Sequence, residues 1–124
     1  MTESVLTLQR TVGAPRDARE RVRRYASLLG PQRTEDAELL VSELVTNAVK
    51  YGPEHGEIRL IVDAHDEHVR VTVHDTGAGP LPEMRPPDRL PHEGGGHGLR
   101  LVDMVSDRWG VERGSTRVWF EFDL

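Results

Sequence analysis

Three polar side chains in the middle of the chain have the types and the spacing of a binding site. Glu43, Asn47 and Lys50 lie four and three residues apart. On a helix, where successive residues turn by about 100°, they project along nearly one line at the border of the apolar face. A carboxylate, an amide and an ammonium in such a row could line the wall of a pocket. The alternative interpretation is a surface ion pair over an exposed Asn.

The carboxylate of Asp75 is a second candidate. It shares strand parity with Val69, Val71 and Val73 and is therefore expected to point toward the core at the end of a strand. A buried carboxylate is costly unless donors meet it, and a purine amine such as that of adenine is a suitable donor. Gly77 and Gly79 follow and would allow close approach. The alternative is an Asp that caps its own turn through the amides of residues 76 and 77.

A third candidate is the glycine-rich run over residues 94–98, which precedes a helix expected from near Leu99. Backbone amides at the start of a helix, together with the helix dipole, form an anion site that glycines leave open. A flexible hinge is the alternative interpretation. The run has neither the spacing of a P-loop nor that of a strand–GxGxxG–helix unit.

The elements that must position these groups follow from hydrophobic periodicity and from the placement of Gly and Pro. They are a strand at 4–8, a helix from Pro15 to the stop at Gly30-Pro31, a helix from an N-cap at Thr34 to Gly52, strands at 58–64 and 69–73, a loop over 77–96, a helix from near Leu99, and strands at 108–112 and 116–123. This order predicts an α+β fold. It would be a two-layer α/β sandwich in which helices cover one face of a mixed, mostly antiparallel sheet.

Composition narrows the class of protein. The 124 residues are the length of one domain, and 36% hydrophobic with 30% charged residues is a globular composition. The absence of cysteine excludes disulfides, thiol nucleophiles and cysteine-ligated metals. No stretch approaches the roughly 18 apolar residues that a membrane helix needs, and we do not expect the first ten residues to be a secretion signal, because they lack a basic start followed by an apolar core. With a net charge of −5, we expect a single cytoplasmic domain over residues 1–124 that binds neither membranes nor nucleic acids.

Three segments in this order resemble a known family. ELVTNAVKYG (43–52), DTGAG (75–79) and GGGHGLRLV (94–102) are similar to the N, G1 and G2 boxes of the GHKL, or histidine-kinase-like, ATPases. The resemblance covers about residues 34–122 and implies a Bergerat-type ATP-binding fold. The short length resembles stand-alone members, the anti-sigma factor serine/threonine kinases, which bind a sigma factor or phosphorylate a small anti-anti-sigma protein.

The resemblance implies ATP and Mg²⁺ as cofactors and assigns roles to the polar row. Asn47 would be the Mg²⁺ ligand, and Mg²⁺ needs few protein ligands because it keeps waters and phosphate oxygens. Glu43 would be the catalytic general base that deprotonates the hydroxyl of the partner's serine, or a water. Lys50 would contact phosphate.

The resemblance also implies an adenine subsite. Asp75 would receive the adenine amine, and Thr116 would assist through a water. Thr116 has the parity of Val118 and of the two phenylalanines in the last predicted strand, so it could face the same pocket. Gly77 and Gly79 would make room for the ring.

The phosphates would lie at the glycine-rich box. Gly96, Gly98 and Leu99 would present backbone amides to them, and residues 80–96 would form the ATP lid. The family often carries a basic residue such as Arg before the last glycine of this box. The chain has His97 there, whose neutral form would contact phosphate more weakly and would make binding depend on pH.

The expected function is therefore that of an ATP- and Mg²⁺-binding regulatory protein. It would be a serine/threonine protein kinase of the anti-sigma factor type, acting on a small anti-anti-sigma partner. The alternative is a non-catalytic, ATP-responsive anti-sigma or adaptor module. The expected protein partners are a sigma factor, an anti-anti-sigma protein or both. The resemblance also implies that the protein forms a homodimer.

Overall fold

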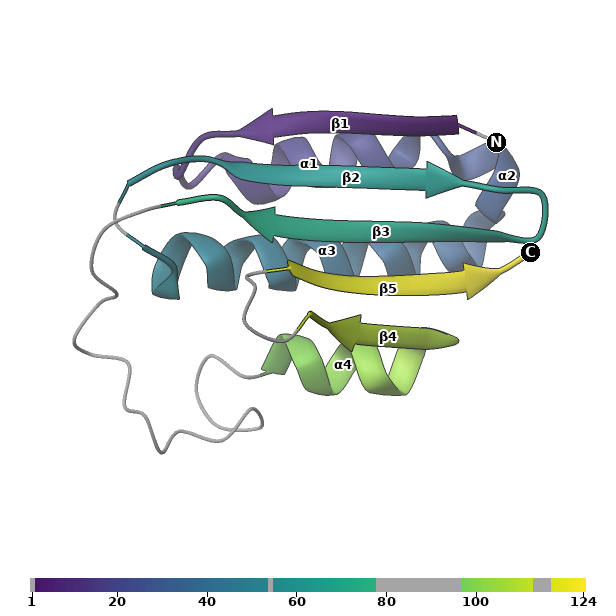
Figure 1. The fold of residues 1–124 in the computed structure, drawn as a ribbon. Helices are drawn as coiled ribbons and strands as arrows, with labels where there is room; N and C mark the ends of the chain where they lie inside the picture. The colour runs from purple at the N-terminus through teal and green to yellow at the C-terminus, as the bar shows by residue number, and fades with distance from the viewer. Residues whose placement is uncertain (1, 54, 78–96, 113–116) are drawn as a thin grey trace.

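An antiparallel sheet organises the chain. The computed structural model describes residues 2–53, 55–77, 97–112 and 117–124, and the side chains of residues 97–99 are not among the described parts. Within these ranges the strands are β1 (Thr2–Leu8), β2 (Ile58–Ala64), β3 (His68–Asp75), β4 (Arg108–Val111) and β5 (Arg117–Asp123). They form a five-stranded sheet in the order β1-β2-β3-β5-β4 (Figure 1), and each neighbouring pair is antiparallel.

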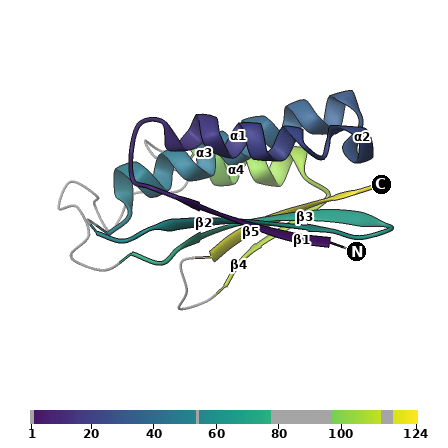
Figure 2. The ribbon, with the colours of Figure 1, turned by 90° about the horizontal axis from the view of Figure 1, so that it is seen from above.

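The helices form a second layer on one face of this sheet. They are α1 (Ala14–Arg23), α2 (Ala26–Leu29), α3 (Pro31–Tyr51) and α4 (His97–Val105). Figure 2 shows them together on one side, and none of the described helices lies on the opposite face of the sheet. The predicted fold class, an α+β two-layer sandwich with an antiparallel sheet, is confirmed.

The hydrophobic core lies between the two layers because the strands alternate as their sequences predict. Ile58, Leu60 and Val62 of β2 point to the helices and are buried, and Val69, Val71 and Val73 of β3 do the same. Phe120 of β5 is the largest of the fully buried side chains. Helix α3 meets them with an apolar face made of Ala37, Leu40, Val41, Leu44 and Val45.

The start of α3 differs from the prediction. Thr34 is not its N-cap, because the helix begins a turn earlier at Pro31 with Gly30 as the N-cap residue. Gly30 has φ +83°, a conformation that favours glycine, and proline suits the first helical position. The Thr34 hydroxyl instead donates to the Gly30 carbonyl at 2.6 Å, inside the first turn.

The single helix predicted between Pro15 and Gly30 is also wrong, since it is divided into α1 and α2. The amides of Arg24 and Tyr25 donate to the carbonyls of Arg21 and Val22, three residues back. This tighter turn ends α1 and redirects the chain. Periodicity alone could not detect the break, because Tyr25 and Leu29 still pack at the core with nearly helical spacing.

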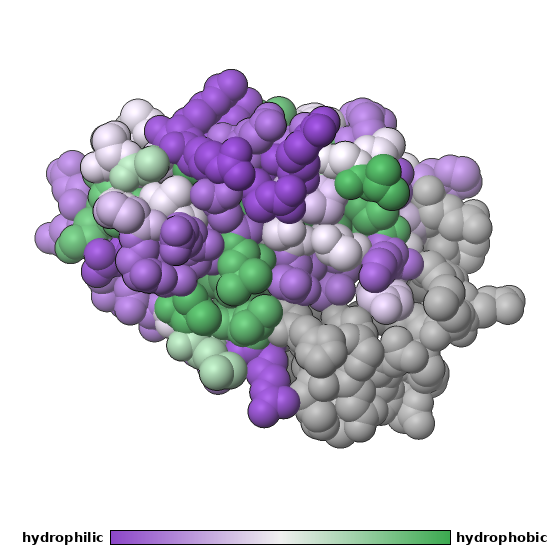
Figure 3. Space-filling view, turned by 180° about the vertical axis from the view of Figure 1, so that it is seen from behind, coloured by the Kyte–Doolittle hydropathy of each residue, from purple (hydrophilic) through white to green (hydrophobic). Residues whose placement is uncertain are grey.

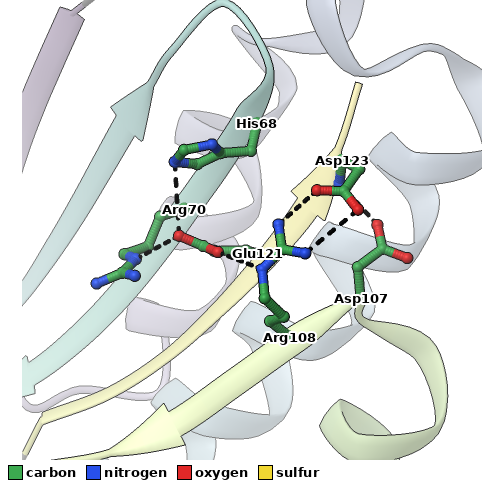
Figure 4. Close-up of polar contacts among 6 residues, drawn as sticks. All are labelled: His68, Arg70, Asp107, Arg108, Glu121 and Asp123. Atoms are coloured by element: carbon green, nitrogen blue, oxygen red, sulfur yellow. Dashed lines mark hydrogen bonds and ion pairs between the residues drawn. The ribbon is translucent and has the colours of Figure 1, made fainter.

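The outward face of the sheet carries a charged cluster, shown in Figure 4. Glu121 is 4% exposed and accepts hydrogen bonds from Arg70 Nε at 2.7 Å and from Arg108 Nε at 2.9 Å. His68 Nε2 lies 3.6 Å from the same carboxylate. Burial raises the pKa of Glu121, but the hydrogen bonds from Arg108 and Arg70 outweigh it and leave the pKa below its usual value.

The helix-bearing face is largely hydrophilic, with hydrophobic residues gathered in limited clusters (Figure 3). Two of its exposed apolar side chains are Leu39 of α3 and Met104 of α4. Across the described ranges we find no helix with the length and hydropathy that crossing a membrane requires.

Candidate functional site

Three segments that are distant in the sequence meet at one end of the sandwich. They are the β1–α1 connection, the last turn of α3 and the end of β3 (Figures 1 and 2). Arg10, in the connection, joins them. Its Nη1 donates to the Ala48 carbonyl of α3 at 3.0 Å, and its Nη2 donates to Oδ1 of Asp75. Both side chains of this ion pair are largely buried, at 10% and 8% exposure.

Asp75 lies where its strand parity predicts. It is the last residue of β3, is buried and shares the inward face of the sheet with the three valines of that strand. Its Oδ1 also accepts the backbone N–H of Gly77 at 2.8 Å. The turn-capping interpretation is therefore correct for this conformation. The proposed role toward an adenine amine stays a prediction.

Two glycines leave the space in which the Arg10–Asp75 pair sits. A Cβ on Gly52 would lie 2.2 Å from Asp75 Oδ2 and 2.5 Å from the Ala48 carbonyl oxygen. A Cβ on Gly77 would lie 2.2 Å from Arg10 Nη2 and 2.3 Å from the His55 carbonyl oxygen. Any side chain at either position would displace the pair, so these positions require glycine for steric reasons. Gly77 thus makes room beside Asp75, and in this conformation a guanidinium occupies that room.

The polar row of α3 lies at the edge of the buried face, as predicted. Glu43 and Asn47 are half-buried, whereas Lys50 is exposed in the last turn. Asn47 precedes Ala48, whose carbonyl binds Arg10, so the row runs toward the Arg10–Asp75 pair. An exposed lysine in the last turn of a helix also interacts favourably with the helix dipole. This placement alone therefore does not select the phosphate role for Lys50.

Helix α4 begins at His97, two residues before the predicted start near Leu99. His97, Gly98 and Leu99 form its first turn, where backbone N–H groups lack partners within the helix. Figures 1 and 2 show this end of α4 directed to the same end of the sandwich as the last turn of α3 and the end of β3. Gly79, Gly96, Thr116 and the predicted lid over 80–96 lie outside the described residues.

A metal at this end would depend on ligands from outside the chain. Within the described ranges, no group of three or more His, Asp or Glu side chains could hold an ion. The amide of Asn47 is a hard oxygen ligand of the kind that Mg²⁺ accepts. One such ligand fits Mg²⁺ when phosphate oxygens and waters complete the coordination.

Sequence reasoning missed Arg10. It precedes the first helix in a segment without periodicity, and 65 residues separate it from Asp75. The one available signal was the buried acid itself, because a carboxylate predicted to face the core requires a cation or several donors. That argument predicts a partner for Asp75 without identifying it.

Comparisons with known proteins agree with this arrangement. The family model described as the histidine kinase-like ATPase domain matches residues 8–122. A crystal structure of the RsbU and RsbW domains of Rv1364c from Mycobacterium tuberculosis is similar, with a TM-score of 0.66 and 20% identity over 99% of this chain. The match spans 32% of that longer chain, and at this identity the likeness concerns the fold alone. No curated protein sequence matches. The family match covers nearly the whole chain, and the protein therefore belongs to the histidine kinase-like ATPase domain family.

Proposed function

We propose that this protein is an ATP- and Mg²⁺-binding regulator that acts as a serine/threonine kinase of the anti-sigma factor type. Its substrate would be a hydroxyl of a small anti-anti-sigma protein. Family membership supports nucleotide binding. The likeness to the structure that contains the RsbW domain of Rv1364c motivates the protein-partner part of the proposal.

One observation carries the proposal. The buried carboxylate of Asp75 and the last turn of α3, which follows Asn47, lie side by side because Arg10 bonds to both Asp75 and Ala48. An acceptor for a purine amine and an oxygen ligand for a phosphate-bound cation thus belong to adjoining elements. The start of α4 is directed to the same end and offers backbone amides for phosphate.

The chain's residues then have separate roles. Asp75 accepts the amine of adenine and selects it over guanine, which carries a carbonyl at that position. Asn47 binds Mg²⁺, and Lys50 neutralises phosphate charge. Glu43, one helical turn before Asn47, accepts the proton of the partner's hydroxyl. The hydroxyl oxygen then bonds to the γ-phosphorus of ATP while the bond between that phosphorus and ADP breaks. Residues 80–96 serve as the lid.

Nucleotide binding is tested first, by isothermal titration with ATP, ADP and GTP in the presence and absence of Mg²⁺. We expect ATP and ADP to bind and GTP to bind at least about ten-fold more weakly, because GTP lacks the 6-amine. Asn47→Ala should remove the dependence on Mg²⁺. Equal binding of ATP and GTP would contradict the assignment of Asp75.

Phosphoryl transfer is tested with labelled ATP and purified anti-anti-sigma proteins. Loss of a general base costs about 10²- to 10⁴-fold in rate. Glu43→Gln should therefore bind ATP as the wild type does and transfer the label at least about 100-fold more slowly. Glu35→Gln, an exposed glutamate on the same helix, is the matched control and should transfer normally. Unchanged transfer by Glu43→Gln would exclude its role as base.

The same assay separates the kinase from the non-catalytic alternative. An ATP-responsive adaptor would transfer no label. Its affinity for a sigma factor would change in Asn47→Ala but not in Glu43→Gln.

The proposal also places the protein in the cytoplasm, with a sigma factor or an anti-anti-sigma protein as partner. Sedimentation with and without ATP tests the further expectation of a homodimer.

A further inference from the structure

The adenine acceptor of the proposed function is already engaged by a group from the chain itself. Asp75 Oδ1 accepts both the Gly77 amide and Arg10 Nη2. Each carboxylate oxygen offers two lone pairs, so these two donors fill the usual capacity of Oδ1, whereas Oδ2 lies on the side of Gly52. The Gly77 amide is two residues away along the same turn, whereas Arg10 comes from another segment of the chain. Arg10 is therefore the donor that can leave.

The guanidinium shares its planar shape and its N–H donors with the ligand that it would exclude, although the guanidinium is charged and the adenine amine is neutral. It is a planar group that presents N–H donors at its edge, as the amino edge of adenine does. Gly52 and Gly77 flank it closely. A Cβ on Gly52 would lie 2.8 Å from Nη1, and one on Gly77 would lie 2.2 Å from Nη2. Arg10 thus fills the space beside Asp75 and also occupies Oδ1, so a ligand amine can approach from this side only after the guanidinium has moved.

Arg10 is incompletely satisfied in this position. Its Nε is buried and has no hydrogen-bond partner among the described residues. A buried donor without a partner raises the free energy of the state that contains it. The resting contact therefore holds Asp75 less tightly than a guanidinium with all of its donors bonded would, and this deficit favours exchange with a ligand.

We propose that Arg10 competes with the purine amine for Asp75 and so sets the affinity for adenine nucleotides. This inference rests on the proposed function. In the nucleotide-free protein Arg10 neutralises the buried carboxylate. On binding, the amine takes its place and the guanidinium moves out from between the two glycines. Each binding event then includes the cost of releasing the ion pair.

The test is isothermal titration of ADP without Mg²⁺ into the wild type, Arg10→Ala and Arg16→Ala. ADP without metal isolates the adenine subsite from the metal site. Arg10→Ala should bind ADP at least about ten-fold more tightly than the wild type, equivalent to about 1.4 kcal/mol at 25 °C. Arg16 is an exposed arginine in the first turn of α1, and its variant should match the wild type.

A second readout covers the possibility that Arg10→Ala destabilises the fold. Without ADP, its thermal unfolding midpoint should be lower than that of the wild type, and saturating ADP should raise it by a larger increment. If Arg10→Ala is unfolded without ligand, Arg10→Lys takes its place. It keeps the charge but loses the planar fork, and it should also bind ADP more tightly.

Equal or weaker ADP binding by the folded Arg10 variants would overturn competition, because Arg10 would then position Asp75 for the ligand. The failure of the proposed function has a different signature. In that case neither the wild type nor any folded variant would bind ADP at all.

Discussion

Among the described residues, arginines hold two buried carboxylates, and they hold them in different ways. Asp75 lies on the helix side of the sheet at the end of β3, paired with Arg10, which is itself only 10% exposed. Glu121 lies on the opposite face in the middle of β5. Its partners Arg70 and Arg108 are 39% and 49% exposed.

The difference separates a structural network from an exchangeable contact. Glu121 is bonded by two arginines, with His68 nearby, and Arg70 also lies 3.9 Å from the ring centre of Trp119. Each cation there retains contact with water. Asp75 is paired with Arg10, which comes from a distant segment and whose buried Nε has no hydrogen-bond partner within the part of the chain that the structure describes. A carboxylate in the second situation is suited to accept a donor from a ligand.

Removing each carboxylate's charge should produce the largest contrast. Asp75→Asn leaves the buried cation of Arg10 without its partner and should lower the free energy of unfolding by about 3–5 kcal/mol. Glu121→Gln should lower it by only about 1–2 kcal/mol, because its arginines can return to water. Urea unfolding at pH 7 measures both values. A cost for Glu121→Gln that equals or exceeds that for Asp75→Asn would break the distinction.

Each of the two regions also contains a glycine packed closely against its neighbours, Gly52 beside Asp75 and Gly110 beside Trp119. The two positions should differ in how well they tolerate an added side chain. A Cβ on Gly52 would meet backbone and a fixed carboxylate, whereas one on Gly110 would meet the edge of the Trp119 ring at 2.8 Å. A half-buried indole can tilt, so we expect Gly52→Ala to cost about 3 kcal/mol and Gly110→Ala about 1 kcal/mol.

Gly13→Ala is the matched control for both glycine variants. Its added Cβ would meet only Thr11 Oγ1, at an ordinary 3.8 Å, so its unfolding should resemble that of the wild type. The Gly110→Ala variant should in addition change the tryptophan fluorescence. A Gly52→Ala variant as stable as Gly13→Ala would show that the packing around Asp75 is looser than described.

The pH dependence of stability sharpens the account of Glu121. Its pKa in the folded protein is below 4.5, its ordinary value, so its contribution is complete above about pH 4.5 and is lost as the pH falls through the folded pKa. The difference in unfolding free energy between the wild type and Glu121→Gln should stay constant from pH 7 to about pH 5 and decrease below about pH 4.5. A difference that is the same at pH 3.5 and pH 7 would count against the arginine network.

The smallest effect is expected at the rim of the same network. Asp123 accepts from Arg108, but both side chains are about half exposed. Exposed pairs of this kind contribute little because water and salt screen them. Asp123→Asn should therefore unfold at the same urea concentration as the wild type in 0.15 M NaCl. A clear loss of stability in Asp123→Asn would show that the exposed Asp123–Arg108 pair belongs to the structural network around Glu121.

Periodicity predicted the sheet, the core and the inward position of Asp75, because strand parity is a local property of the sequence. It also placed Glu43 and Asn47 at the edge of the buried face of α3. The break near Tyr25 and the early start of α3 at Pro31 depended on turn geometry that the apolar pattern does not contain. Thr34 resembled an N-cap by residue type alone.

Arg10 shows the limit of reasoning from local sequence. Its partners Ala48 and Asp75 are 38 and 65 residues away, and only the fold brings them together. Electrostatics predicts that a buried carboxylate needs a partner, but only the fold of the chain determines which residue that partner is. The roles assigned to Gly79, Gly96 and Thr116 stay predictions, since these residues lie outside the described ranges.

The central claim is that Asp75 receives the amine of adenine. The most direct measurement compares the affinities of the wild type and of Asp75→Asn for ATP and for inosine triphosphate. ATP has an amine at position 6 of the purine, whereas inosine triphosphate has a carbonyl there. Circular dichroism first establishes that Asp75→Asn is folded. We expect the wild type to prefer ATP by about ten-fold or more, and the Asp75→Asn variant to lose that preference because its amide also offers a donor. An undiminished preference for ATP in Asp75→Asn would contradict the account.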